Sequence, residues 1–243
     1  MLQTPPALAM LAAWERGQQQ GPVERGLTLL ALASPDHEHG ALEVLSIGER
    51  DRRLIALREA LFGQRMTGLV TCERCGGRAE LEFDARDLRA AEPAGDAALV
   101  LSADGYDLQL RLPDSRDLLA VAVADAARAP SVLLERCLVY ARRGGETAAA
   151  ADLPNHLVDA AGRRLADADP QADVRFSVTC PACSHAWSAP FDVVSYLWTE
   201  LDAWAEHLLA DVHVLASAYG WSETDILALS PARRQSYLRM AGA

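Results

Sequence analysis

One short segment occurs twice in this chain, in distant parts of the sequence. The first copy reads VTCERCGGRAELEFD from Val70, and the second reads VTCPACSHAWSAPFD from Val178. Both begin Val-Thr-Cys-x-x-Cys, and both reach Phe-Asp at the same distance past the second cysteine. A C-x-x-C turn presents two thiolates on one side of a tight loop, so two such turns facing each other complete a closed tetrahedral zinc site.

The repeat therefore predicts a structural Zn²⁺ ion bound by Cys72 and Cys75 from the first copy and by Cys180 and Cys183 from the second. Ordinary zinc ribbons separate their cysteine pairs by ~15–20 residues, and the separation here is far larger. Because loop-closure entropy rises only logarithmically with length, a long insertion is tolerable, and one that folds on its own costs less. The pattern is that of a split zinc ribbon.

Two other interpretations of the four cysteines stay open. In the first, the site has lost its metal through divergence and keeps reduced thiols in the core. In the second, the thiols are redox-active, although a thioredoxin-like motif needs a βαβ context that the sequence lacks. His185 follows the second pair and is an alternative ligand. Cys137 lies in the apolar segment SVLLERCLVYA and is expected to be a small buried side chain.

Composition narrows the class of protein. The formal net charge of −11 argues against nucleic-acid binding, which needs a basic face. The N-terminus shows neither a basic region nor a small-residue cleavage site. No apolar run approaches the ~18 residues of a membrane-spanning helix. We therefore expect a cytoplasmic protein with reduced thiols and no membrane partner.

The remaining patterns predict an α+β fold, with helical segments at both ends around a small antiparallel β region that carries the split four-cysteine ribbon. Strands flank each C-x-x-C turn, and Asp104-Gly105 marks a hairpin. Helices are predicted at 5–17, 22–33, 49–63 and 130–141, with a linker-like stretch at 142–154. The predicted segments are 1–66, 67–190 and 191–243, integrated into one domain.

A long helix is predicted from Asp192 to Tyr219, because no Pro or Gly interrupts it and its apolar residues fall on one stripe. Gly220 ends it, and a capping pattern at Ser222 starts a short helix. The terminal segment PARRQSYLRM is basic and amphipathic in an acidic chain. It is either a solvated last turn or a helix that docks on a partner.

No familiar catalytic pattern is present in the sequence. Phosphate-binding loops, dinucleotide-binding loops, nucleophile elbows and H-E-x-x-H are all missing. Asp36–His39 reads DHEH, which a Pro- and Gly-bounded loop explains as a solvated turn. A zinc ion closed by four thiolates has no open position for water. The expectation is that the protein is not an enzyme.

Several segments, taken in order along the chain, can be compared with known families. They include AWERG, GERDRRLIALREALFG, CPACSHAWSAPFDV and AYGWSETDILALSPARRQSYL. Together they resemble the baseplate hub assembly chaperones of contractile-tailed phages of the T-even type and of related contractile injection systems. The likeness covers nearly the whole chain, and its most specific part is the C-terminal block.

The resemblance implies a non-enzymatic assembly chaperone or minor structural component of the baseplate hub. Its partners would be baseplate hub or spike proteins and other phage tail assembly proteins, contacted through the segment from Trp221 to Met240. The alternative is a zinc-ribbon regulatory protein that binds nucleic acid or polymerase. The two C-x-x-C turns favour this alternative, and the acidic net charge opposes it. A thiol oxidoreductase is a third possibility, which requires an exposed cysteine of low pKa.

Overall fold

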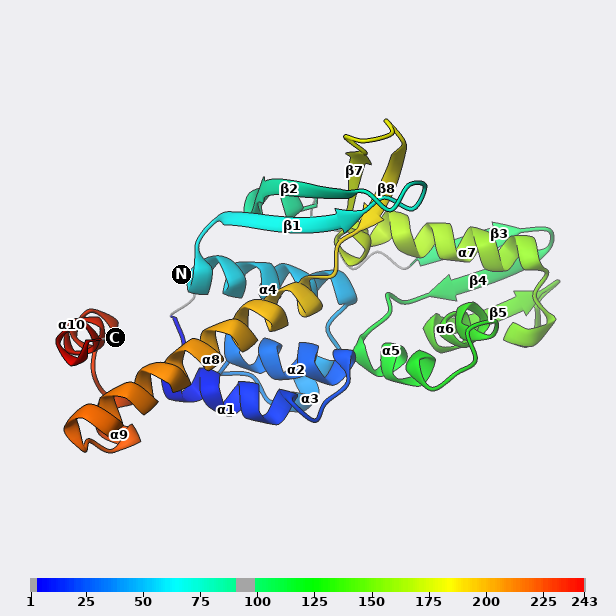
Figure 1. The fold of residues 1–243 in the computed structure, drawn as a ribbon. Helices are drawn as coiled ribbons and strands as arrows, with labels where there is room; N and C mark the ends of the chain where they lie inside the picture. The colour runs from blue at the N-terminus through cyan, green and yellow to red at the C-terminus, as the bar shows by residue number, and fades with distance from the viewer. Residues whose placement is uncertain (1–3, 91–98, 243) are drawn as a thin grey trace.

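The computed structural model, which describes residues 4–90 and 99–242, has a group of helices, a separate four-stranded sheet beside it, and two β-hairpins along the top of the molecule in Figure 1. The sheets are antiparallel throughout the described residues. The prediction of an α+β fold with helical ends and a small antiparallel β region is confirmed.

The helical group combines the N-terminal third of the chain with the long C-terminal helix, and α8 packs across α1, α2 and α4 (Figure 1). Its core is built from aliphatic side chains of these helices together with Trp198. The Ser46 hydroxyl accepts the backbone N–H of Glu49 to start α4, and Gly63, at φ 87°, ends it. The helices are α1 (Ala7–Gly17), α2 (Pro22–Ala33), α3 (His39–Glu43), α4 (Ile47–Phe62) and α8 (Val193–Tyr219).

Helix α8 begins and ends where its sequence predicts. The Asp192 carboxylate accepts the backbone N–H groups of Val194 and Ser195, which satisfies two of the donors left free at a helix start. Gly220 adopts φ 69°, the left-handed conformation that commonly terminates helices. Two short helices follow it, α9 (Glu223–Leu227) and α10 (Pro231–Ala241).

Each hairpin carries one C-x-x-C turn at its tip. Strands β1 (Arg65–Thr71) and β2 (Arg78–Asp84) pair with Thr71 opposite Arg78. Strands β7 (Arg175–Thr179) and β8 (Ala186–Pro190) pair with Thr179 opposite Ala186. The two copies of the repeated segment therefore fold into hairpins of the same register, and the 3₁₀ helix η1 (Ala85–Leu88) follows the first.

The chain between the two hairpins forms an insert with its own core. Its sheet has the strand order β3-β4-β5-β6, and the Asp104-Gly105 turn predicted from sequence joins β3 to β4 with positive φ at both residues. Its core residues include Leu108, Leu134 and Leu157. The elements are β3 (Leu99–Ala103), β4 (Tyr106–Leu110), α5 (Ser115–Ala122), α6 (Ala129–Cys137), β5 (Leu138–Arg143), β6 (Glu146–Thr147), η2 (Ala150–Asp152), α7 (Asn155–Ala168) and η3 (Pro170–Asp173).

Two predictions inside the insert are wrong. The helix predicted at 130–141 ends at Cys137, because Leu138–Arg143 pairs with β4 as strand β5. The stretch predicted as a linker at 142–154 contains a hairpin turn at Gly144-Gly145, both with positive φ, followed by β6 and η2.

One buried side chain joins the two ends of the insert. Gln171, 1% exposed, accepts the backbone N–H of Ala90 at 2.9 Å and donates its amide to the carbonyl of Leu88 at 3.0 Å. Closing a flexible loop of about 100 residues costs about 4–5 kcal/mol of chain entropy. An insert whose ends already meet avoids most of that cost. Little further chain entropy is therefore lost when the two hairpins, which are distant in sequence, come together.

Across the described parts of the chain, none of the helices combines the length and the apolar character needed to cross a membrane.

Candidate metal centre

The first C-x-x-C turn, from Cys72 to Gly77, is tight and is held by backbone hydrogen bonds; we call it the first knuckle, and the turn from Cys180 to His185 the second. The N–H of Cys72 donates to the carbonyl of Gly77 at 2.8 Å, and the N–H of Gly76 donates to the carbonyl of Cys72 at 2.9 Å. Gly77 also donates its N–H to the sulfur of Cys75 at 3.4 Å. These bonds place both sulfurs on the same side of the turn.

The second knuckle repeats this arrangement. The N–H of Cys180 donates to the carbonyl of His185 at 2.8 Å, and the N–H of Ser184 donates to the carbonyl of Cys180 at 2.9 Å. Ser184 stands at φ 57°, where the first knuckle has Gly76 at φ 71°. A non-glycine residue in this conformation costs about 1–2 kcal/mol, so the turn is imposed by the fold rather than by the local sequence.

The four sulfurs lie close together. Sγ of Cys72 is 3.7 Å from Sγ of Cys183, Sγ of Cys75 is 3.6 Å from Sγ of Cys180, and all four ligand atoms lie within 4.8 Å of one another. Four sulfurs at about 2.3 Å from a zinc ion would be about 3.8 Å apart at the corners of a tetrahedron. The arrangement therefore fits a tetrahedral metal ion, and none of the four cysteines forms a disulfide.

The electrostatics of the cluster favour a cation. Hydrogen bonds from the backbone of Cys183 are the main reason that the pKa of Cys180 falls to about 7. The backbone N–H of His185 lowers the pKa of Cys183, but the neighbouring thiols and burial outweigh it and raise that pKa to about 12. Of these two thiols, Cys180 therefore ionises more readily, whereas Cys183 resists ionisation unless a positive ion compensates the added charge.

Burial argues against a redox role for this cluster. Cys72 and Cys180 are each 1% exposed, while Cys75 is exposed and Cys183 half-buried. A redox cysteine needs a low pKa on an accessible sulfur, whereas here the lowered pKa belongs to the buried Cys180. A site with four protein ligands also leaves no position for substrate or water.

Aromatic residues at the base of both hairpins hold them together. The ring centroids of Phe83 and Phe176 are 4.6 Å apart, and Phe191 lies 5.7 Å from each of them. Phe83 and Phe191 are the phenylalanines of the repeated Phe-Asp, so the repeat places equivalent rings against each other. Tyr196 of α8 extends the cluster, 5.5 Å from Phe191.

The hairpins are fixed to the helical group through the same tyrosine. The Tyr196 hydroxyl accepts the backbone N–H of Thr67 and donates to the carbonyl of Thr67. The neighbouring Arg58, 3% exposed, forms two hydrogen bonds to the Glu200 carboxylate and one to the carbonyl of Gly63. These contacts join α4, β1 and α8, so the metal centre is attached to the helical core on a fixed base.

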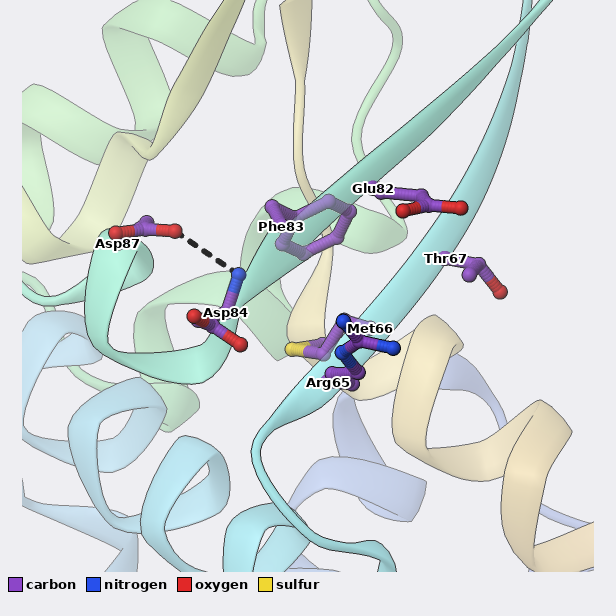
Figure 2. A pocket seen from close by; sticks show the side chains of 7 residues that line it. All are labelled: Arg65, Met66, Thr67, Glu82, Phe83, Asp84 and Asp87. Atoms are coloured by element: carbon purple, nitrogen blue, oxygen red, sulfur yellow. Dashed lines mark hydrogen bonds between the residues drawn. The ribbon is translucent and has the colours of Figure 1, made fainter.

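A cavity of about 310 Å³ opens beside the base of the β1–β2 hairpin, and Figure 2 shows its lining. Two of its three carboxylates have partners: Asp87 accepts the backbone N–H of Asp84, and Asp84 pairs with Arg86. The lining contains no histidine, cysteine or serine. The lining residues are Arg65, Met66, Thr67, Glu82, Phe83, Asp84 and Asp87.

The side chains of the other sequence candidates are not part of the four-sulfur cluster. Cys137 is fully buried in the core of the insert, where burial raises its pKa to about 11. His185 stacks on Trp187 with ring centroids 6.0 Å apart. Asp36, His37 and Glu38 are exposed. Within residues 4–90 and 99–242 the four cysteines form the cluster whose geometry could hold a metal ion.

Sequence reasoning missed the residues that hold the centre in place. Gln171, Arg58 and Tyr196 act through hydrogen bonds between elements far apart in the chain. No local spacing marks such residues, although a buried arginine or glutamine always requires a partner.

Comparison with known proteins gives one match. A family model described as T4 bacteriophage base plate protein matches residues 31–198. The matched span contains both hairpins, the insert and the start of α8, and it ends before most of α8, α9 and α10. No curated protein and no solved structure matches the chain.

Proposed function

Since the chain belongs to the T4 bacteriophage base plate protein family, we propose that this baseplate component acts at the hub of a contractile phage tail or contractile injection system. There it serves as a non-enzymatic assembly chaperone or a minor structural component. Its partners are other baseplate proteins, in particular hub or spike proteins, and it meets them in the cytoplasm of the producing cell. The observation that carries the proposal is the family match over residues 31–198.

A structural role is supported by the chemistry of the molecule. Four cysteine ligands would leave a bound ion no free coordination position, and two of the three carboxylates that line the cavity in Figure 2 already have partners. The net charge of −11 disfavours the alternative of a regulator that binds nucleic acid.

We assign the metal as Zn²⁺, bound by Cys72, Cys75, Cys180 and Cys183. Sulfur-only tetrahedral sites select zinc or iron–sulfur centres, and sulfur spacings of 3.6 and 3.7 Å fit one ion. The ion would connect the two hairpins, so that metal binding contributes to folding.

Elemental analysis of the purified protein tests the metal, with one zinc per chain as the expected result. Cys72→Ser or Cys180→Ser should lower the zinc content and the melting temperature sharply, because loss of one thiolate removes most of the binding energy. The matched control is Cys137→Ala, which lies in the insert core and should keep full zinc content. Full zinc content in Cys180→Ser would contradict the assignment.

The assembly role is tested by deleting the coding sequence and imaging the particles by electron microscopy. Loss or malformation of the baseplate hub is expected, while separately expressed sheath and tube proteins remain intact. Co-expression of the chain with hub and spike proteins should yield a complex that survives size-exclusion chromatography. Normal particles in the deletion strain, together with no complex, would overturn the proposal.

A further inference from the structure

The last two helices form a small unit at the far end of α8. Figure 1 shows α8 leaving the helical group and carrying α9 and α10 at its distal end, away from both hairpins and from the insert. We call residues 209–242 the C-terminal arm. Its core consists of Leu215, Ile226 and Leu238. The arm is therefore held by its own packing and presents most of its surface outward.

Helix α10 has one face turned inward and one turned outward. Arg234, 9% exposed, pairs with Asp211 of α8 at 3.2 Å, and Leu238 lies beside it in the arm core. On a helix of 3.6 residues per turn, the opposite face carries Arg233, Ser236, Arg239 and Met240. Met240 is 67% exposed.

The charge of this face differs from that of the molecule. Residues 226–243 contain three arginines and no acidic residue, in a chain whose formal net charge is −11. Arg234 is neutralised by Asp211, whereas neither Arg233 nor Arg239 pairs with a carboxylate of the described residues. The guanidinium of Arg239 contacts the Ser236 hydroxyl at 3.1 Å. Arg233 and Arg239 thus share the outer face of α10 with the exposed Met240, and within the described residues neither arginine forms an ion pair.

An aromatic cluster borders the same face. Tyr219 stacks on Trp221 with ring centroids 4.7 Å apart, and Tyr237 meets Trp221 edge-on at 4.8 Å. Tyr219 is 38% exposed. Tyrosine, tryptophan and arginine are the residues that dominate binding energy at protein interfaces, and methionine adapts to irregular partner surfaces.

We propose that the outer face of α10, with the bordering aromatic cluster, docks on an acidic surface of another baseplate protein. Charge complementarity selects the occupant, because arginines without a counter-charge recognise carboxylates. A nucleic acid fits less well, since the rest of the chain repels phosphate. This inference rests on the proposed function and adds to it the surface and the charge of the partner.

The test uses the full chain co-expressed with hub and spike proteins, with the affinity of the resulting complex measured by biolayer interferometry. Arg233→Glu combined with Arg239→Glu should weaken binding by about 100-fold, because attraction is replaced by repulsion. The matched control is Arg163→Glu combined with Arg164→Glu on α7, two exposed arginines that undergo the same charge change. The control should bind within about 3-fold of wild type, and both double variants should keep the wild-type melting temperature.

Each outcome decides between the proposals. Equal binding by the α10 variant and wild type would overturn the docking inference and leave the baseplate role standing. Absence of any wild-type complex would overturn both. Sedimentation velocity of the isolated protein provides a further check, and a dimer abolished by the α10 substitutions would assign the face to a second copy instead. Binding of a 20-base-pair DNA duplex that the substitutions abolish would assign it to nucleic acid.

Discussion

Gly48 stands where the buried carboxylate of Asp169 meets helix α4. Its N–H donates to Oδ2 of Asp169 at 2.8 Å, and a Cβ atom there would lie 1.7 Å from Oδ1. Gly48→Ala should therefore destabilise the protein by about 3 kcal/mol, because Asp169 must move and lose its hydrogen bond. Urea unfolding monitored by circular dichroism measures the change.

The matched control is Gly162→Ala in helix α7, where an added Cβ meets nothing within 4 Å. That substitution should stabilise the protein by about 0.5–1 kcal/mol, since alanine loses less chain entropy in a helix. If both substitutions had the same sign, the close approach of Asp169 would not be the reason for glycine at position 48.

The carboxyl group of Asp51 makes the free energy of unfolding depend on pH. Burial is the largest cause that raises its pKa from 3.8 to about 6, against the lowering effect of Arg50. Because the folded state holds this proton more tightly than the unfolded state, the free energy of unfolding falls as pH rises from about 4 to 6.

Asp51→Asn removes that ionisation while keeping an oxygen that accepts from Arg50 Nε. Relative to wild type, the variant should gain on the order of 2 kcal/mol between pH 4 and pH 7. Urea unfolding of both proteins across this range measures the difference, which should be constant above pH 7. A difference that does not change with pH would show that Asp51 titrates normally.

At the scale of elements, the clearest sequence patterns gave the correct result. Asp192 and Gly220 bound helix α8 as capping rules require. The apolar run Leu138–Ala141 fits a buried helix as well as a strand, so the sequence pattern wrongly predicts that it continues the helix before it. Its pairing with Leu108 and Gln109 of β4 decides the matter, and that partner is distant in sequence.

The contacts that Gln171, at one end of the insert, makes with the other end lead to a prediction at this scale. Gln171→Ala should cost about 2 kcal/mol, because it leaves the half-buried N–H of Ala90 and the buried carbonyl of Leu88 without this partner. It should also speed transfer of metal to a chelator, since the ends of the insert separate more readily. Stopped-flow transfer to a chromophoric chelator measures this rate.

Gln64→Ala is the comparison for that experiment. The Gln64 amide makes an exposed hydrogen bond to Glu59, so its loss should change neither the stability nor the rate noticeably. A rate for Gln171→Ala equal to that of Gln64→Ala would mean that the insert does not constrain the metal centre.

At the scale of the whole molecule, the repeated segment predicted that distant thirds of the chain meet, and the structure brings the four sulfurs together. The docking of the hairpins on α8 through Tyr196 and the separate core of the insert could not be predicted. Both depend on packing between elements rather than on any local period.

Removal of the metal should destabilise the two hairpins more than it destabilises the insert. After chelation, amide hydrogen exchange should rise strongly in both hairpins, because they lose the ion that connects them. Strand β4 should keep its protection, since Leu108 and Leu110 belong to the core of the insert. Mass spectrometry of exchanged peptides distinguishes the two regions. Uniform loss of protection would mean that the insert depends on the metal for its own stability.

The long separation in sequence between the two knuckles also determines when the metal site can form during translation. Cys75 and Cys180, whose sulfurs end up 3.6 Å apart, are 105 residues apart in the chain. At a translation rate of about 5–20 residues per second, the first pair waits roughly 5–20 s for the second to be made. During that interval the insert can fold on the ribosome. The metal ion would then bind late, when most of the chain is already folded.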